Sequence, residues 1–483
     1  MRPMGEPFHE EGVEHRDREQ DRREDLDGRG GTRHAPREVT DPRRFGKCQP
    51  CNSDLPFRPG SVENAAVPTD RLAADLEALL PAALAHLKAW VDTNSWSFNP
   101  AGVAEVARLT ALAFAPLGFS AESVPSTDPR HGAHLVLTRR GTGPASVLLV
   151  SHLDTVFPPE EEQRNHFRWQ PEGNRIYGPG THDIKGGTAL AWLTLEGLRR
   201  HAPDVFESTT WLFCLNSSEE VLSTDFADVC RDRIGPGTRA ALVFEAEGFR
   251  DGTRRLVVAR KGRASWRVAV SGRGSHAGVK HAHGANALTQ LGRLMDRIAG
   301  FTDPARDLTF NVGIARGGSG LNRVPESAEA EGEFRAFTPE AYAVGKSRLL
   351  ALDGPGDVSS PVDGFACRVS VELTSEMAPW PRNPGTDALF ALWADAAVAL
   401  GQRLEPESRG GLSDGNQLWN LVPTLDGLGP SGDNDHCSER SADGTKLPEY
   451  ADRNSFVPKA LLNIEALRRL LRPGSVGAGT PAA

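Results

Sequence analysis

Three side chains able to bind a metal ion follow one short apolar segment of the sequence. Residues 146–150 (SVLLV) have the length and β-branched content of a buried strand. His152 and Asp154 come directly after this segment, and residues i and i+2 of an extended chain point to the same face. Asp183 follows the glycine turn at 178–180. Nitrogen and oxygen donors in this arrangement suit a metal such as Zn²⁺.

Two other interpretations of this stretch compete with a metal site. A His-x-Asp triplet is common as an ordinary polar end of a strand. The glycines beside Lys185 also invite a phosphate-binding P-loop, which needs Gly directly before Lys and Ser or Thr directly after it. Ile184 precedes Lys185 and Gly186 follows it. The P-loop is therefore excluded, and the metal hypothesis depends on further ligands downstream.

Further candidate ligands follow two more apolar segments. The segment 210–215 leads into adjacent Glu219 and Glu220, and the segment 240–244 ends at Glu245. Neighbouring carboxylates in a turning loop point in different directions. One can then bind a metal while the other acts as general base on a water that the metal activates, which is what amide hydrolysis needs. The alternative is a solvated acidic turn at the start of a helix, where the helix dipole favours acidic residues.

The late loop histidine His436 adds a second nitrogen donor to this set. By itself it would be an ordinary loop histidine. As a fifth candidate ligand beside His152, Asp183, one of the two adjacent glutamates and Glu245, it adds the nitrogen donor that the set otherwise lacks.

Composition limits the class of protein. At 483 residues the chain is long enough for two or three domains. The net charge of −9 suggests no nucleic-acid partner. The sequence contains no apolar run long enough to span a bilayer and no signal-peptide h-region. Six scattered cysteines fit a reducing compartment, so we expect a cytoplasmic protein with no membrane partner.

The N-terminal residues differ in composition from the rest of the chain. Residues 1–45 are rich in Arg, Glu, Asp and Gly and show no hydrophobic period. We therefore predict a disordered, charged segment over 1–68. Cys48-x-x-Cys51 near its end resembles half a zinc knuckle, but no second pair follows at the right spacing, which favours a chance occurrence.

Hydrophobic periodicity predicts an α/β open sheet flanked by helices. The expected helices cover 72–87, 103–113, 188–198, 387–400 and 457–471, and the expected strands cover 119–124, 133–138, 146–150, 210–215 and 240–244. Three of these strands lead into loops that carry acidic residues or histidine. Ligands of open α/β sheets gather at the carboxyl ends of strands, so we expect the candidate ligands to meet there.

A different pattern occupies residues 259–376. Strands at 264–272, 309–315, 328–337 and 368–373, with helices around 288–298 and 339–352, give the order β-α-β-β-α-β of a ferredoxin-like unit. We predict an inserted α+β domain here. The catalytic domain would then comprise 69–258 and 377–483, the latter with a short flexible C-terminal tail.

Seven motifs, in order, resemble the M20 family of metallopeptidases. They are Ser151-His152-Leu153-Asp154, Gly178-x-Gly-x-x-Asp183-x-Lys-Gly-Gly, Glu219-Glu220, Phe244-Glu245, Ser275-His276-Ala277-Gly278, Asn322-x-Val324-Pro325 and Gly-x-x-x-His436. The family includes glutamate carboxypeptidase, acetylornithine deacetylase and succinyl-diaminopimelate desuccinylase. The resemblance covers residues 70–472. It implies a zinc-peptidase-type mixed sheet with an inserted ferredoxin-like lid and dimerisation domain.

The resemblance also implies a site with two Zn²⁺ ions, for which Co²⁺ or Mn²⁺ could substitute. Asp183 would bridge the metals, His152 and Glu245 would hold one, and Glu220 and His436 the other. Glu219 would be the general base. Asp154 would not bind metal but would orient His152.

Further residues concern the substrate. The resemblance implies that His276 reaches the site from the partner subunit of a homodimer and donates to the oxyanion. Arg335, in Glu333-Phe334-Arg335, would bind a substrate carboxylate, although an exposed strand charge is the alternative. Asn286 matches a position near the substrate. The loop ending in Ser413-Asp414 would line the pocket, but it departs from the more common Gly-Gly-Thr-Asp.

These expectations favour hydrolysis of an amide next to a free carboxylate. The substrate would be a small peptide or an N-acyl-amino acid, so the enzyme would be a carboxypeptidase or a deacylase. An aminopeptidase or dipeptidase of the same family is the alternative, and Glu rather than Asp at 245 favours the first by resemblance. A non-catalytic binding protein that keeps the fold is a third hypothesis. The intact ligand set and base argue against it.

Overall fold

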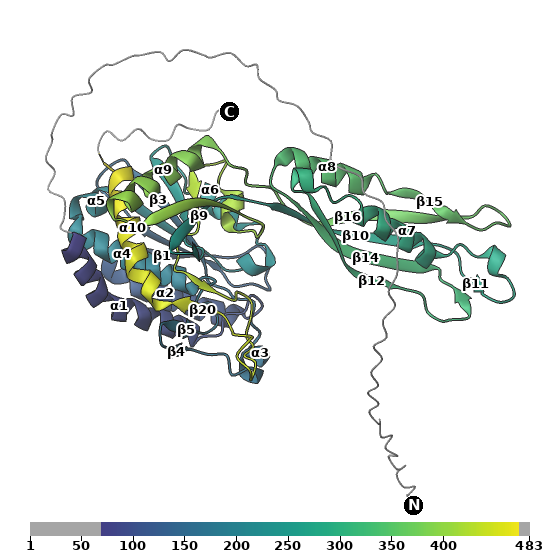
Figure 1. Cartoon of the computed structure of the whole chain (residues 1–483), viewed down its shortest axis with the longest axis horizontal. Coiled ribbons are helices and arrows are strands. Elements are labelled where there is room, and N and C mark those ends of the chain that lie inside the picture. Colours follow the sequence, from purple (N-terminus) through teal and green to yellow (C-terminus); the bar gives the residue numbers. More distant parts are fainter. Residues whose placement is uncertain (1–68, 473–483) are drawn as a thin grey trace, which may run out of the picture. The chain divides into compact units, whose positions relative to one another are not determined.

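The computed structural model describes residues 69–472. The predicted disordered segment 1–68, with Cys48 and Cys51, and the tail from 473 onward lie outside the described residues. The described chain has a mixed α/β fold with two principal sheets, each covered by helices (Figure 1).

The larger sheet has six strands in the order β1-β2-β6-β3-β7-β18. Its strands are β1 (Ser120–Val124), β2 (His134–Arg139), β6 (Thr210–Asn216), β3 (Ser146–His152), β7 (Thr238–Val243) and β18 (Thr424–Leu425). The central strand β3 runs parallel to both of its neighbours, β6 and β7. The carboxyl ends of these three strands therefore meet at one edge of the sheet, where open α/β sheets bind their ligands.

Helices cover both faces of this sheet, which explains the continuous apolar run of β3. Val147 and Leu149 belong to one hydrophobic core, and Leu148 and Val150 belong to another. The first core is built with α1 (Thr69–Val91), α2 (Pro100–Phe114), α4 (Lys185–His201), α9 (Pro384–Ala399) and α10 (Phe456–Leu470). The second includes the short helix α6 (Phe226–Arg231).

The second sheet has five strands in the order β12-β14-β10-β16-β15. They are β12 (Thr309–Gly317), β14 (Ser327–Ala336), β10 (Gly262–Ser271), β16 (Ala366–Met377) and β15 (Gly354–Ser359). Helices α7 (Ala287–Ala299) and α8 (Pro339–Leu350) pack on it around a separate core that contains Trp266, Leu291 and Phe334. The first four strands have the ferredoxin-like order. The edge strand β15 is an addition that the sequence pattern did not predict.

Short strands that the sequence analysis left as loops form two smaller sheets. One joins β17 (Arg403–Arg409), β9 (Thr253–Arg260) and β8 (Gly248–Arg250). The other joins β19 (Gly432–Asp433), β20 (Tyr450–Asp452), β5 (Arg175–Tyr177) and β4 (Gln170–Glu172). Most of these strands are too short to show a period of two. Pairing of β20 with β5 matters for the site, because it brings the loops after 177 and before 450 together.

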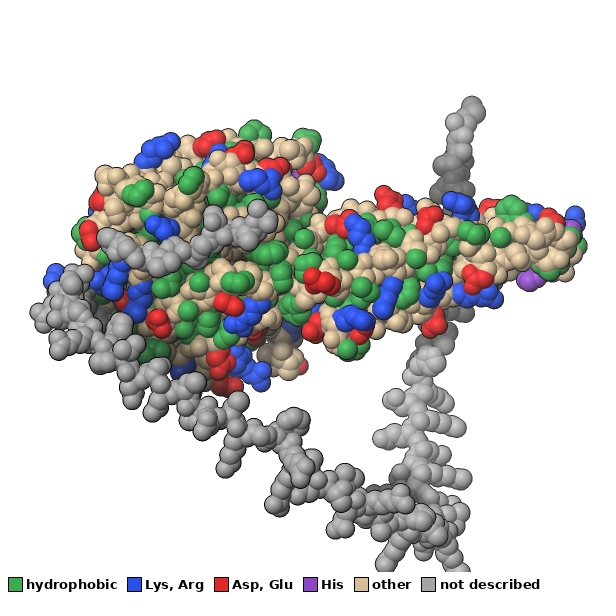
Figure 2. Space-filling view, turned by 90° about the horizontal axis from the view of Figure 1, so that it is seen from above, with side chains coloured by type: hydrophobic (Ala, Val, Ile, Leu, Met, Phe, Trp, Pro, Cys, Tyr) green, Lys and Arg blue, Asp and Glu red, His purple; other side chains and the backbone are tan. Residues whose placement is uncertain are grey.

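Charged side chains of both signs are interspersed on the visible surface (Figure 2). Several form ion pairs on the five-stranded sheet, such as Arg267 with Glu329 and Arg316 with Glu331. Among the helices of residues 69–472, none is long and apolar enough to cross a membrane.

The start of α4 packs closely against the end of β7. A Cβ atom at Gly187 would lie 1.9 Å from the carbonyl oxygen of Phe244. We expect Gly187→Ala to lower the free energy of unfolding by about 1–3 kcal/mol, because backbone must shift to relieve this overlap. Denaturant titration followed by circular dichroism measures the change.

Gly292 provides the matched control. It lies exposed within α7, and a Cβ there would have no atom within 4 Å. Gly292→Ala should stabilise the protein by up to about 1 kcal/mol through helix propensity. Equal effects of the two substitutions would contradict the close packing at Gly187.

Candidate metal and catalytic site

The parallel strands of the larger sheet bring several predicted residues to one edge. His152 is the last residue of β3, and Glu245 follows the end of β7. Glu219 and Glu220 lie in a short 3₁₀ turn, Glu219–Val221, that follows β6. Because β6, β3 and β7 are neighbours, their terminal side chains converge.

Asp183 and His436 arrive from loops outside the large sheet. Asp183 lies in the turn before α4, and His436 follows β19. The pairing of β20 with β5 holds these two loops together. His436 has a φ of 62°, in the left-handed region that non-glycine residues rarely adopt. A tight turn therefore presents its ring to Asp183.

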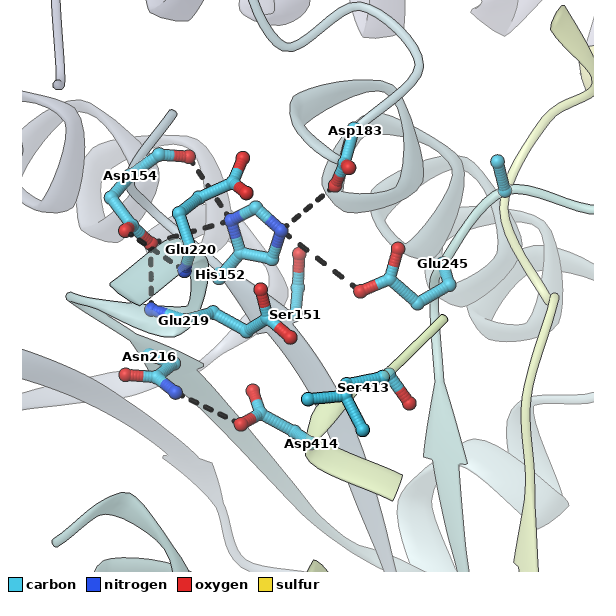
Figure 3. A network of polar contacts seen from close by, with 12 residues as sticks. Ser151, His152, Asp154, Asp183, Asn216, Glu219, Glu220, Glu245, Ser413 and Asp414 are labelled. Atoms are coloured by element: carbon cyan, nitrogen blue, oxygen red, sulfur yellow. Dashed lines mark hydrogen bonds and ion pairs between the residues drawn. The ribbon is translucent and has the colours of Figure 1, made fainter. Parts of the chain in front are cut away.

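The five predicted metal ligands form two groups that share Asp183. Nε2 of His152 lies 3.0 Å from Oδ1 of Asp183 and 3.9 Å from Oε1 of Glu245 (Figure 3). Nε2 of His436 lies 3.3 Å from Oδ2 of Asp183 and 3.2 Å from Oε2 of Glu220. Each group offers one imidazole nitrogen and two carboxylate oxygens, which is a donor set that divalent cations such as Zn²⁺ accept.

The carboxylates of this cluster carry more negative charge than the protein compensates. Burial, with the charge of Asp183 adding to it, raises the pKa of Glu220 to about 7. Burial and Asp183 likewise raise the pKa of Glu245 well above its usual range. Buried carboxylates normally coordinate metals or pair with cations. Divalent cations therefore fit the charge of this cluster as well as its donor atoms.

The pKa values of the two histidines of the cluster are raised as well. The carboxylates of Asp183 and Glu220 raise the pKa of His436 to about 11. Burial lowers the pKa of His152, but hydrogen bonds to Asp154 and Asp183 outweigh burial and raise it well above the usual value. A metal binds the neutral imidazole, so cation binding would displace these protons.

Asp154 connects the histidine at the end of β3 to the Glu219–Glu220 turn. Its carboxylate is fully buried (0% exposed) and accepts hydrogen bonds from Ser97 Oγ at 2.6 Å, Glu219 N at 3.1 Å and Glu220 N at 3.3 Å. Its Oδ1 lies 3.4 Å from Nδ1 of His152, and the same nitrogen lies 3.0 Å from the backbone carbonyl oxygen of Asp154. The sequence predicted the contact with His152. The contacts with the turn join residues 65 and 66 positions apart, so no local pattern could indicate them.

The carboxylate of Glu219 is left free by this arrangement. Within residues 69–472 it accepts no hydrogen bond, and it faces the space beside His152, Asp183 and Glu245 (Figure 3). Burial raises the pKa of Glu219 well above its usual range, and the charge of Asp414 adds to the effect.

Glu449 is a buried acidic residue of the site that the sequence analysis missed. Its Oε1 accepts hydrogen bonds from the backbone N–H of His182 at 2.9 Å and of Asp183 at 3.1 Å. The ring of His182 in turn contacts Asp435, the neighbour of His436. Glu449 thus holds the backbone that carries the shared ligand. It lies in a polar loop without periodicity, so only the fold places it here.

A cleft of about 330 Å³ opens beside the cluster. Its lining includes four arginines, of which the sequence predicted Arg335 and missed Arg260, Arg263 and Arg409. Arg335 donates to both carboxylate oxygens of Glu333, at 2.7 and 3.2 Å, and to the carbonyl oxygen of Gly410 at 2.8 Å. Arg335 thus lines the cleft, and its contact with a substrate carboxylate stays a prediction.

Two predicted residues, His276 and Asn286, do not line this cleft. His276 lies exposed in β11 (Ser275–His276), and its Nδ1 accepts from the backbone N–H groups of Gly278 and Val279, both at 3.1 Å. Asn286 is the N-cap of α7 and accepts from Thr289 N at 3.0 Å. Their contacts with substrate stay predictions.

Comparison with known proteins places this architecture among metallopeptidases. Residues 148–453 match the family described as peptidase family M20/M25/M40. Carboxypeptidase G2 of Pseudomonas sp. (strain RS-16) is 30% identical over 262 residues, which cover 54% of this chain and 61% of that protein. Acetylornithine deacetylase of Klebsiella pneumoniae is 28% identical over 277 residues, which cover 53% of this chain and 69% of that protein.

Solved structures share the fold over a longer span. The aminopeptidase PepT from Bacillus cereus superposes with a TM-score of 0.63 at 20% identity, over 81% of this chain and 99% of that one. An M20 family metallo-carboxypeptidase from Sulfolobus solfataricus gives a TM-score of 0.61 at 14% identity, over 80% and 99%. At these identities the likeness concerns the fold alone.

The contacts of Asp154 lead to a test of its positioning role. We expect Asp154→Asn to weaken divalent-cation binding by roughly 10- to 100-fold, because an amide neither polarises His152 nor accepts as strongly from the Glu219–Glu220 turn. Calorimetric titration of the metal-free protein with Co²⁺ measures the affinity. Asp128→Asn, at an exposed carboxylate that pairs with Arg130, is the control. Unchanged Co²⁺ affinity in Asp154→Asn would contradict this role.

Proposed function

This chain belongs to the peptidase family M20/M25/M40, and from that premise we propose that it is a two-zinc hydrolase of amide bonds next to a free carboxylate. Its substrates would be small peptides or N-acyl-amino acids. The observation that carries the proposal is the pair of donor groups sharing Asp183, with the free carboxylate of Glu219 beside them. Co²⁺ or Mn²⁺ could replace zinc in the same donor set.

The chemistry divides between the bound cations and the protein. When present, two divalent cations would supply an activated water and stabilise negative charge on the substrate carbonyl oxygen. Glu219 accepts a proton from the attacking water and later delivers it to the leaving amine. Its buried position and raised pKa suit a group that must hold a proton between these steps. Asp154 keeps Glu219 in place through the backbone of the turn.

The arginines of the cleft support a substrate that ends in a carboxylate. Arg335 lines the cleft, and the Nη N–H groups that Glu333 and Gly410 do not accept remain for a substrate carboxylate. An aminopeptidase or dipeptidase would instead need an anionic group for the free amine of its substrate. Besides the candidate metal ligands and Glu219, the charged side chains that line the cleft are these four arginines and one acidic residue, Asp435. This distribution favours a carboxypeptidase or deacylase.

Replacing each of the two adjacent glutamates separately by glutamine distinguishes their proposed roles. Glu219→Gln should lower kcat by about 10²- to 10⁴-fold, because a general base is lost. It should retain the metal content of the wild-type protein. Glu220→Gln should instead lose metal, because Glu220 belongs to the donor group formed with His436 and Asp183. Release of free amine from N-acetyl-amino acids and elemental analysis provide the two readouts. Metal loss in Glu219→Gln alone would mean that the roles are reversed.

The position of His276 supports an active site shared between two chains. β10 spans ten residues, Gly262–Ser271, and is therefore roughly 30 Å long. Arg263 at its start lines the cleft, whereas His276 follows its far end and pairs with Arg323 ahead of β14. His276 is thus remote from its own cleft. Because Nδ1 accepts two backbone N–H groups, Nε2 carries the proton and can donate to an oxyanion of a partner's substrate.

Complementation tests the shared site. We mix His276→Ala with Glu219→Ala, each of which should be nearly inactive alone. If His276 acts in the partner's site, mixed dimers contain one site with both residues intact, and amide hydrolysis should return toward half of the wild-type rate per mixed dimer. Subunit exchange is verified with differently tagged chains. Absence of recovery after verified exchange would place His276 in its own chain's site or outside catalysis.

A further inference from the structure

Three of the four arginines that line the cleft have a close carboxylate partner. Arg260 Nε donates to Asp426 at 2.7 Å, and Arg409 Nε donates to Glu407 at 2.8 Å. Arg335 is held by both oxygens of Glu333. Each of these three guanidinium groups also donates to a backbone carbonyl oxygen of a neighbouring loop. Their positions are therefore accounted for by the protein itself.

Arg263, the fourth arginine of the cleft, lacks such partners. Its side chain is only 25% exposed, and its Nε is buried without a hydrogen-bond acceptor in the described part of the chain. Its nearest carboxylate is Oε2 of Glu333, at 4.0 Å, which Arg335 already contacts at 3.2 Å. Burial lowers the pKa of Arg263. A buried N–H donor without an acceptor is costly, so an acceptor from outside the described chain would stabilise the Nε end of this guanidinium.

The sheet register makes this arrangement less favourable still. Arg263 on β10 lies directly opposite Arg335 on β14. Like charges in opposite positions of paired strands destabilise a sheet. The two arginines share the carboxylate of Glu333, which Arg335 contacts more closely, so Arg263 has the weaker ion pair of the two. An anionic ligand in the cleft would give Arg263 a closer partner than Glu333 does.

We infer that Arg263 is a specificity-determining residue that binds a second carboxylate of the substrate, beside the one bound by Arg335. The preferred leaving group would be an amino acid with an acidic side chain, glutamate or aspartate. Opposite side chains on paired strands have Cβ atoms about 4.5–5.5 Å apart, a spacing that two carboxylates of one amino acid can match. A carboxylate on the acyl group would lie across the scissile amide from Arg335. This inference rests on the proposed amide hydrolysis.

Substrate pairs that differ in one charge test the inference. N-acetyl-L-glutamate is compared with N-acetyl-L-glutamine, and alanyl-glutamate with alanyl-glutamine, for wild type and Arg263→Gln. We expect the wild type to prefer the acidic member of each pair. Arg263→Gln should lower kcat/KM for the acidic members by roughly 10- to 100-fold, the effect of losing a charged hydrogen bond, and should change the neutral members little. N-succinyl-L-leucine against N-acetyl-L-leucine reports a carboxylate on the acyl side.

Arg267→Gln is the matched control. Arg267 lies on the same strand, pairs with Glu329 on the surface and does not line the cleft. It should leave the preference for acidic substrates unchanged. A second readout, independent of turnover, is calorimetric binding of L-glutamate and L-glutamine. Arg263→Gln should weaken the binding of L-glutamate alone.

The outcomes separate this inference from the proposed function. Hydrolysis of acidic and neutral substrates at equal rates, or equal losses for both in Arg263→Gln, would overturn the role of Arg263 and leave amide hydrolysis standing. A preference for the succinyl substrate that Arg263→Gln abolishes would overturn the placement of the second carboxylate. If no amide is hydrolysed, the proposed function fails. L-glutamate binding that is insensitive to Arg263→Gln then overturns the inference as well.

Discussion

The structure depends on the burial of several carboxylates at the carboxyl ends of three parallel strands, β6, β3 and β7. Glu220 and Glu245 stand beside Asp183, and burial raises the pKa of both above the usual range. Such a cluster is unfavourable unless cations or hydrogen-bond donors compensate it. His152 and His436 supply part of this compensation through Asp183. The remaining negative charge is what suits this edge to divalent cations.

Two further buried acids hold the cluster through the backbone rather than through other side chains. Asp154 accepts from the N–H groups of Glu219 and Glu220, and Glu449 accepts from those of His182 and Asp183. Backbone donors are not displaced when a ligand or proton binds nearby. The turns that carry the proposed base and the shared ligand are therefore fixed before any substrate arrives, as electrostatic catalysis requires.

Charge in the cleft is divided between the two principal sheets. The larger sheet contributes the acidic cluster at the carboxyl ends of its parallel strands. The five-stranded sheet contributes Arg263 at the beginning of β10 and Arg335 near the end of the antiparallel strand β14. This division of charge supports the proposed substrate, whose carboxylate would meet the arginines while its scissile amide would meet the cluster. The ferredoxin-like unit thus places two arginines beside the acidic cluster of the larger sheet.

The local sequence pattern was enough to predict the strands β3, β6 and β7, because short apolar runs bounded by turn residues are typical of buried strands. The residues after these strands, with Asp183, could be identified as donors from their types and order. Only the tertiary structure decided which donors meet, because that depends on pairings between residues far apart, such as β20 with β5. Strand register likewise set Arg263 opposite Arg335, and a register is not visible in the composition of either strand.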